Sequence, residues 1–136
     1  MNLDDLVKQC KEKKIRIPNL SNPRSFRLEG YKLGFTRYSE NRGGGVADII
    51  SKPGDFCWGV VFDVGQSDLY ILDKKEGVKD GSYRRVMLPN YMVTYEVVQK
   101  EKFIQPSNKY VDIIIEGARR YSLPPDWIGY LKSFKI

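Results

Sequence analysis

Residues 72–85 read LDKKEGVKDGSYRR, and this short stretch contains the end of a helix, a turn and the start of a strand. Ser67 can cap a helix over Asp68–Lys75, because polar residues with short side chains are preferred at that position. Gly77 supplies the left-handed residue that commonly ends a helix. A strand is expected at Tyr83–Leu88, where aromatic and β-branched residues recur. A helix that leads directly into a strand predicts a fold that mixes both kinds of element.

Glu76 occupies an unusual place on this helix. At about 100° per residue, with Leu69 at about 0°, Leu72 lies at about 300° and Glu76 at about 340°, so its carboxylate points toward the core. It also lies in the last turn, where the helix dipole disfavours a carboxylate by about 0.3–1 kcal/mol. Both effects destabilise the ionised form and favour a proton acceptor at neutral pH. The alternative is a carboxylate that reaches solvent or pairs with Arg84 or Arg85.

The flanking sequence predicts further helices and strands. Asn2 can cap a helix over residues 3–14, where apolar residues recur at i, i+3, i+4 and i+7. Ser107 begins another helix, and a double proline separates it from a final helix at residues 126–134. The expected strands are residues 26–35, 45–50, 57–64, 83–88 and 91–98, with a turn at 52–55. Roughly five strands interleaved with helices predict a mixed α+β fold whose strands form a small β-barrel with flanking α-helices.

The composition excludes several classes of protein. The 136 residues are 41% hydrophobic and 29% charged, which predicts one globular domain over residues 1–136. We expect neither a membrane span nor a secretory signal. Without histidine, Ser-His-Asp triads, Cys-His pairs and His-ligated metal sites are excluded. Cys10 and Cys57 form no disulfide framework, and both are expected in the core of a cytoplasmic protein.

Positive charge is concentrated near the N-terminus. Residues 1–42 contain 10 Lys and Arg against 5 Asp and Glu, whereas residues 43–136 contain 13 against 12. A basic stripe could contact phosphates, but the solvated face of one short helix is the favoured explanation, because no nucleic-acid-binding motif accompanies the stripe. Binding to nucleic acid is therefore kept only as an alternative function. Gly43–Gly45 lacks the Lys-Ser/Thr of a phosphate loop, so a flexible surface turn is expected there.

Several stretches of this chain resemble the γ-glutamylcyclotransferase-like family. Residues 72–85 resemble the family motif LDxxEGVxxGxYxR, and GVADIISKPGDFCWGVVFDV at 45–64 resembles its strand pair. PSNKYVDIIIEGARRYSLP at 106–124 resembles the C-terminal helix of the family, and FRLEGYKLGF at 26–35 resembles its early strand. These stretches occur in the order of the family and span nearly the whole chain.

The resemblance implies an enzyme, a lyase or acyltransferase that cyclises a γ-glutamyl group to 5-oxoproline and releases an amine or amino acid. It implies that Glu76 is the general acid/base, and that Tyr83, Tyr110, Arg85 and Gly77 belong to the substrate-binding pocket. It implies a small barrel with flanking helices. The partner is then a small γ-glutamyl molecule, and neither a metal nor a cofactor takes part.

The chain departs from the family at its beginning. Family members start with a strand that ends in a YGSN loop, which holds the α-carboxylate of the substrate. The sequence MNLDDL resembles the stretch directly after that loop, so we expect the first strand to be missing. Either the start lies upstream, or the chain is a shortened form that binds its ligand with impaired catalysis. A missing strand would leave unpaired backbone groups that a second copy could cover in a homodimer.

Overall fold

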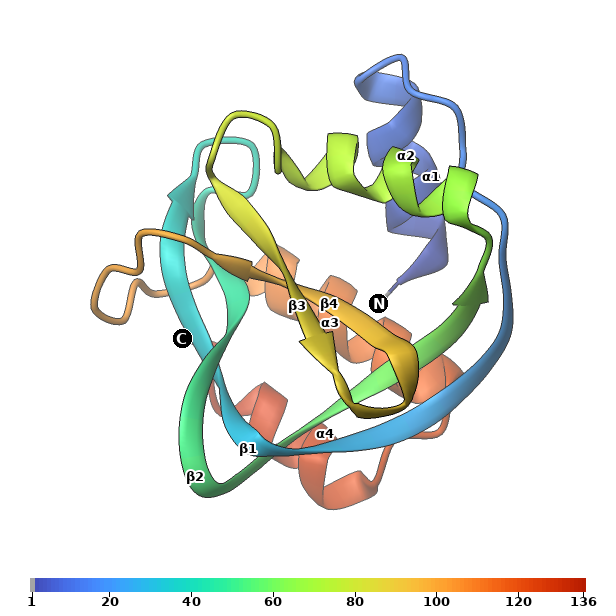
Figure 1. Cartoon of the computed structure of the whole chain (residues 1–136). Helices are drawn as coiled ribbons and strands as arrows, with labels where there is room; N and C mark the ends of the chain where they lie inside the picture. The colour runs from blue at the N-terminus through green and yellow to red at the C-terminus, as the bar shows by residue number, and fades with distance from the viewer. Residues whose placement is uncertain (1) are drawn as a thin grey trace.

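Figure 1 shows the computed structural model of the chain, which describes residues 2–136. Two antiparallel hairpins are combined with α-helices, and the predicted mixed α+β class is confirmed. In chain order the elements are α1 (Leu3–Glu12), β1 (Leu20–Ser39), β2 (Gly44–Val64), α2 (Gln66–Glu76), β3 (Tyr83–Leu88), the 3-10 turn η1 (Pro89–Tyr91), β4 (Met92–Val97), α3 (Asn108–Arg120) and α4 (Pro125–Lys132).

The long hairpin β1–β2 replaces three of the expected strands. The Pro-Gly signal at residues 52–55 does not reverse the chain. Glu29 lies opposite Phe56 and Tyr31 lies opposite Ser51, so residues 52–55 protrude as a bulge within β2. Turn residues such as Gly and Pro are also the residues that bulges use, which is why the sequence suggested a break between two strands.

The short hairpin β3–β4 forms a second sheet of its own. Its register runs from Tyr83 opposite Val97 to Leu88 opposite Met92, close to the predicted strands. Within residues 2–136 no hydrogen-bonded ladder joins this sheet to β1–β2, so the predicted barrel is not closed. The Asp48 side chain connects the two sheets instead, because it accepts a hydrogen bond from the N–H of Val97 at 2.9 Å.

The helix ends follow the predicted caps with one exception. Asn2 accepts a hydrogen bond from the N–H of Asp5 at 3.1 Å, and Ser107 accepts one from the N–H of Tyr110 at 3.2 Å. The helix α2 begins at Gln66 after Gly65, so the predicted Ser67 cap is wrong. Its other end is as expected, with Gly77 in the left-handed conformation at φ 69°.

The triple glycine is also different from its prediction. Gly43, with φ +72°, lies in the turn between β1 and β2, but Gly44 and Gly45 are buried in β2. A Cβ on Gly44 would lie 2.6 Å from the carbonyl oxygen of Gln105, so the glycines permit close packing against the chain before α3.

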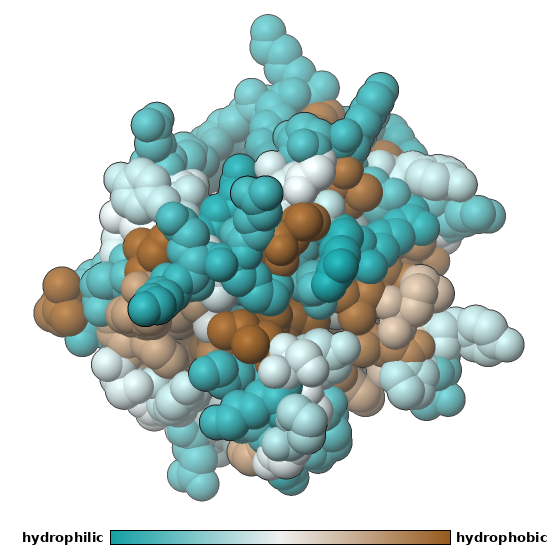
Figure 2. Space-filling model, turned by 60° about the vertical axis from the view of Figure 1, so that its left-hand side comes forward, coloured by the Kyte–Doolittle hydropathy of each residue, from teal (hydrophilic) through white to brown (hydrophobic). Residues whose placement is uncertain are grey.

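Two apolar clusters form the core. One joins Cys57 on β2 to α3 and α4, and the other joins Leu6 and Cys10 on α1 to Leu72 on α2. Both cysteines are buried as predicted. In Figure 1, α1 and α2 accordingly lie together at one end of the molecule. The face in Figure 2 is mostly hydrophilic with scattered apolar side chains, as is usual for a protein surface. Among residues 2–136, no helix has the length and apolar character needed to cross a membrane.

Candidate functional site

A cavity of about 610 Å³ lies between the two hairpins and the helices. Its size is typical of small-molecule sites, which occupy about 300–1,000 Å³. The lining includes Glu76 and Gly77 from the end of α2, Tyr83 from β3 and Tyr110 from α3. Four of the five predicted site residues are thus brought to one cavity from three separate segments.

Glu76 faces this cavity with a side chain that is 21% exposed. Its Oε1 lies 2.8 Å from Nζ of Lys75, whose side chain is 15% exposed and lines the same cavity. A partly buried ion pair of this kind holds the carboxylate in place at the cavity wall. The alternative pairing with Arg84 or Arg85 does not occur, because these arginines bind Glu96 and Asp73.

Two tyrosines form an aromatic part of the wall. The Tyr110 hydroxyl accepts a hydrogen bond from the N–H of Ala47 at 3.0 Å, and burial raises the pKa of Tyr110 to about 12. Burial also raises the pKa of Tyr83, and the nearby Glu76 carboxylate adds to this effect. Both phenols are therefore neutral at physiological pH and offer hydrogen bonds rather than charge.

Arg85 is the predicted site residue that the fold places elsewhere. It is absent from the cavity lining, although it lies opposite Tyr95 on the face of the short hairpin that carries Tyr83. Its Nε donates to Oδ1 of Asp73 at 2.8 Å, and its Nη2 donates to Oδ2 at 2.5 Å. A guanidinium engaged in this way is not free to bind a substrate in the cavity.

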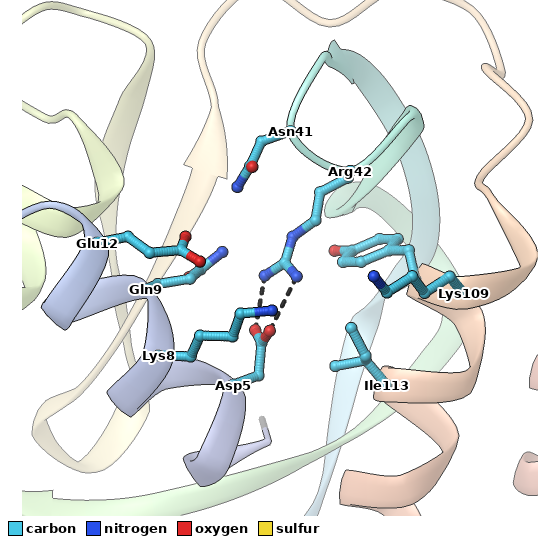
Figure 3. Close-up of a pocket in the computed structure, with 9 residues that line it drawn as sticks. Asp5, Lys8, Gln9, Glu12, Asn41, Arg42, Lys109 and Ile113 are labelled. Carbon is cyan, nitrogen blue, oxygen red and sulfur yellow. Dashed lines mark hydrogen bonds and ion pairs between the residues drawn. The ribbon is translucent and has the colours of Figure 1, made fainter.

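An ion pair between α1 and the β1–β2 turn was not apparent from the sequence. Arg42 donates to both carboxylate oxygens of Asp5, at 2.9 and 2.6 Å, and Figure 3 shows its side chain reaching toward that helix. The hydrogen bond that Arg42 donates to Asp5 raises the pKa of Arg42, and the guanidinium lies over the Tyr110 ring at 5.1 Å. The pair lines both the cavity and an adjoining pocket of about 70 Å³. No spacing rule could find it, since the partners are 37 residues apart.

Arg37 is a second residue that the sequence did not single out. It lines the cavity, its Nη2 lies 3.3 Å from Oγ of Ser82, and its guanidinium lies 5.6 Å from the centre of the Tyr83 ring. In the part of the chain that the structure describes, no carboxylate lies within 4.0 Å of it. The described residues also contain no group of three His, Cys, Asp or Glu placed to hold a metal.

Comparison with known proteins identifies a family of related sequences. The AIG2-like family matches residues 57–131. Gamma-glutamylcyclotransferases of Bos taurus and Homo sapiens are 35% and 33% identical to this chain over 126 residues. Each match covers 80% of the chain but 64% of the relative, so the match spans less than two-thirds of the length of these proteins.

Solved structures lead to the same family. A gamma-glutamyl cyclotransferase superimposes with a TM-score of 0.75 at 30% identity, covering 97% of this chain and 83% of that one. An uncharacterized protein from Homo sapiens superimposes with a TM-score of 0.65 at 32% identity, covering 82% of this chain and 75% of that one. The resemblance seen in the sequence is thereby confirmed, and the chain belongs to the γ-glutamylcyclotransferase-like, or AIG2-like, family.

Proposed function

We propose that this chain is an enzyme of the γ-glutamylcyclotransferase type, with Glu76 as its general acid/base. The observation that carries the proposal is the half-buried Glu76 carboxylate, which faces a 610 Å³ cavity beside Tyr83 and Tyr110. The family relationship supports the same chemistry, because relatives of similar sequence are gamma-glutamylcyclotransferases.

The reaction needs one proton acceptor that later becomes a proton donor. Glu76 takes a proton from the α-ammonium group of the substrate, and the freed nitrogen attacks the γ-carbonyl carbon. The new C–N bond closes the five-membered ring of 5-oxoproline as the bond to the departing amine breaks. Glu76 returns the proton to that amine, and the second proton of the ring nitrogen also passes to the amine, which leaves as an ammonium ion. The lactam is then neutral at nitrogen, and the enzyme ends as it began. Because ring closure is intramolecular, holding the substrate folded supplies much of the rate.

Neighbouring groups suit the remaining needs of this reaction. Lys75 holds the Glu76 carboxylate through its ammonium group, and the neutral phenols of Tyr83 and Tyr110 offer hydrogen bonds to the substrate. At Gly77 a Cβ would lie 3.1 Å from both carboxylate oxygens of Asp80, so the absent side chain keeps this turn close to the cavity wall. We assign Arg37 to a substrate carboxylate, since a guanidinium matches that group in shape and charge.

The test is the formation of 5-oxoproline from γ-glutamyl amino acids and γ-glutamylamines, measured by mass spectrometry. We expect Glu76→Gln to lower kcat by roughly 10²- to 10⁴-fold, the usual contribution of a general base. Glu116→Gln is the matched control, because Glu116 is exposed on α3 and does not line the cavity. Turnover that survives Glu76→Gln unchanged would remove Glu76 from the mechanism. Substrate binding without any product would instead support a non-catalytic binding protein.

A further inference from the structure

Two adjacent arginines on β3 each bind a carboxylate, but they connect different parts of the fold. Arg84 donates from Nε and Nη2 to Oε1 of Glu96 at 3.0 and 2.6 Å, which links β3 to β4 within one hairpin. Arg85 donates to both oxygens of Asp73, which links the hairpin to α2. Only the second pair reaches the helix that carries Glu76.

Asp73 collects a third hydrogen bond from the same hairpin. The Tyr95 hydroxyl on β4 donates to Oδ1 of Asp73 at 2.6 Å, and Tyr95 itself lines the cavity. Burial by itself raises the pKa of the Asp73 carboxyl, but the hydrogen bonds from Arg85 and Tyr95 outweigh it and hold the pKa below its ordinary value. The Asp73 side chain is 19% exposed, so this charged group is well fixed between α2 and both strands.

The main chain of Asp73 holds the turn that directly follows Glu76. Its carbonyl oxygen accepts the N–H of Gly77, and it also accepts the N–H of Val78 at 3.1 Å. Asp73 is therefore bound to β3 and β4 through its side chain and to the end of α2 through its carbonyl. Any shift of this residue would move the last turn of the helix, and with it the Glu76 carboxylate.

We propose that Asp73, Arg85 and Tyr95 form a positioning cluster that holds the last turn of α2, so that Glu76 faces the cavity. The catalytic consequence rests on the proposed function. Arg85 then acts on the reaction through Asp73 and Glu76, without contact to the substrate. A displacement of about 1 Å at a reacting group can cost about 100-fold in rate, so such a cluster has a measurable effect.

The test compares Arg85→Gln with Arg84→Gln, because each change removes a two-point contact between β3 and a carboxylate. We expect Arg85→Gln to lower kcat by roughly 10- to 100-fold, with KM changed by less than about threefold. Arg84→Gln is expected to leave kcat unchanged. Arg85→Lys should recover part of the loss, because a lysine restores the positive charge but not the planar guanidinium that contacts both carboxylate oxygens. Should Arg85→Gln fail to fold, Tyr95→Phe removes one bond of the cluster and takes its place.

A second readout does not depend on activity. Amide hydrogen exchange at Gly77 and Val78 should accelerate in Arg85→Gln and remain as in the wild type in Arg84→Gln. Equal effects of the two variants on kcat and exchange, or no effect of Arg85→Gln, would contradict a positioning role for the Asp73, Arg85 and Tyr95 cluster. If the wild type makes no 5-oxoproline, the proposed function fails, and the exchange measurement alone then decides whether the cluster holds this turn.

Discussion

Arg37 shows how a single residue gains a function from its surroundings. Of the arginines that line the cavity, Arg42 is paired with Asp5, whereas Arg37 has no carboxylate within 4.0 Å among the described residues and lies against Ser82 and Tyr83. Contact with an aromatic ring and a hydroxyl orients the guanidinium without cancelling its charge. Nothing in the local sequence distinguishes these two arginines, since the difference lies in which carboxylates the fold brings near.

Replacing this residue should affect binding more than chemistry. We expect Arg37→Gln to raise KM for γ-glutamyl substrates by roughly 10- to 100-fold, the effect of one lost charge-assisted hydrogen bond, with a small change in kcat. Steady-state kinetics measures both quantities. Arg24→Gln is the control, because Arg24 pairs with the exposed Asp63 and does not line the cavity. A KM that stays at the wild-type value would exclude a carboxylate contact at Arg37.

At the scale of elements, the first residues of β2 are glycines because the backbone before α3 packs directly against them. A Cβ on Gly45 would collide with the carbonyl of Ile104, and the N–H of Gly45 donates to the carbonyl of Gln105 at 3.1 Å. This contact joins the long hairpin to the segment that leads into α3, the helix that carries Tyr110. Gly44 and Gly45 thus allow close packing against this segment, whereas the sequence had suggested a flexible surface turn.

Adding one methyl group at this contact should destabilise the protein. We expect Gly45→Ala to lower the free energy of unfolding by about 1–3 kcal/mol through overpacking against backbone. The free energy is measured by urea denaturation followed by circular dichroism. Gly59→Ala, in the same strand, is the control, because a Cβ there meets nothing within 4 Å. That change should be neutral or stabilise by up to about 1 kcal/mol. Equal effects of both substitutions would contradict the packing argument.

For the whole molecule, two aspartate side chains connect the two hairpins and α2, which no sheet hydrogen bonds join in the described part of the chain. Asp48, whose side chain is fully buried, bonds Thr36 on β1 at 2.6 Å, the backbone of Val97 on β4 and the Lys100 ammonium at 2.9 Å. Asp73 connects α2 to the short hairpin in the same manner. The relative position of the two hairpins and α2, and hence the cavity between them, depends on the contacts of these two carboxylates.

Stability should therefore fall in acid. The pKa of Asp73 is lower in the folded chain than its ordinary value of 3.8, so its contribution is complete above about pH 3.8 and is lost as the pH falls through the folded value. Asp73→Asn should lower the melting temperature at pH 7 and reduce its dependence on pH below 3.8. Thermal unfolding at pH 7, 5 and 3 measures this, with Asp126→Asn as the control, because Asp126 is exposed and forms no ion pair among the described residues. An unchanged pH dependence in Asp73→Asn would count against the contribution of Asp73.

The local sequence was sufficient to predict the helix ends and the short hairpin. Asn2, Ser107 and Gly77 act through hydrogen bonds and dihedral angles within a few residues, so their caps are visible without the rest of the chain. The resemblance of residues 72–85 led to the family and to Glu76 for the same reason, because the motif is contiguous. It could not show whether Lys52–Asp55 turns the chain or bulges from it, since that depends on the partner strand.

The tertiary structure alone decided which side chains meet. Glu76, Tyr83 and Tyr110 share a cavity because two hairpins and α3 converge on it. Arg85 lies on the same face of β3 as Tyr83, but its guanidinium is taken up by Asp73 on α2, so it does not line the cavity. The pairs Asp5–Arg42 and Asp73–Arg85 depend on contacts between distant segments, which no periodicity encodes. The sequence by itself determined the α-helices, the short hairpin and the acid at the end of α2, whereas the extent of β1 and β2 depended on their pairing with each other. Long-range packing determined the cavity that Glu76 faces, because a cavity forms only where distant segments of the chain are brought together.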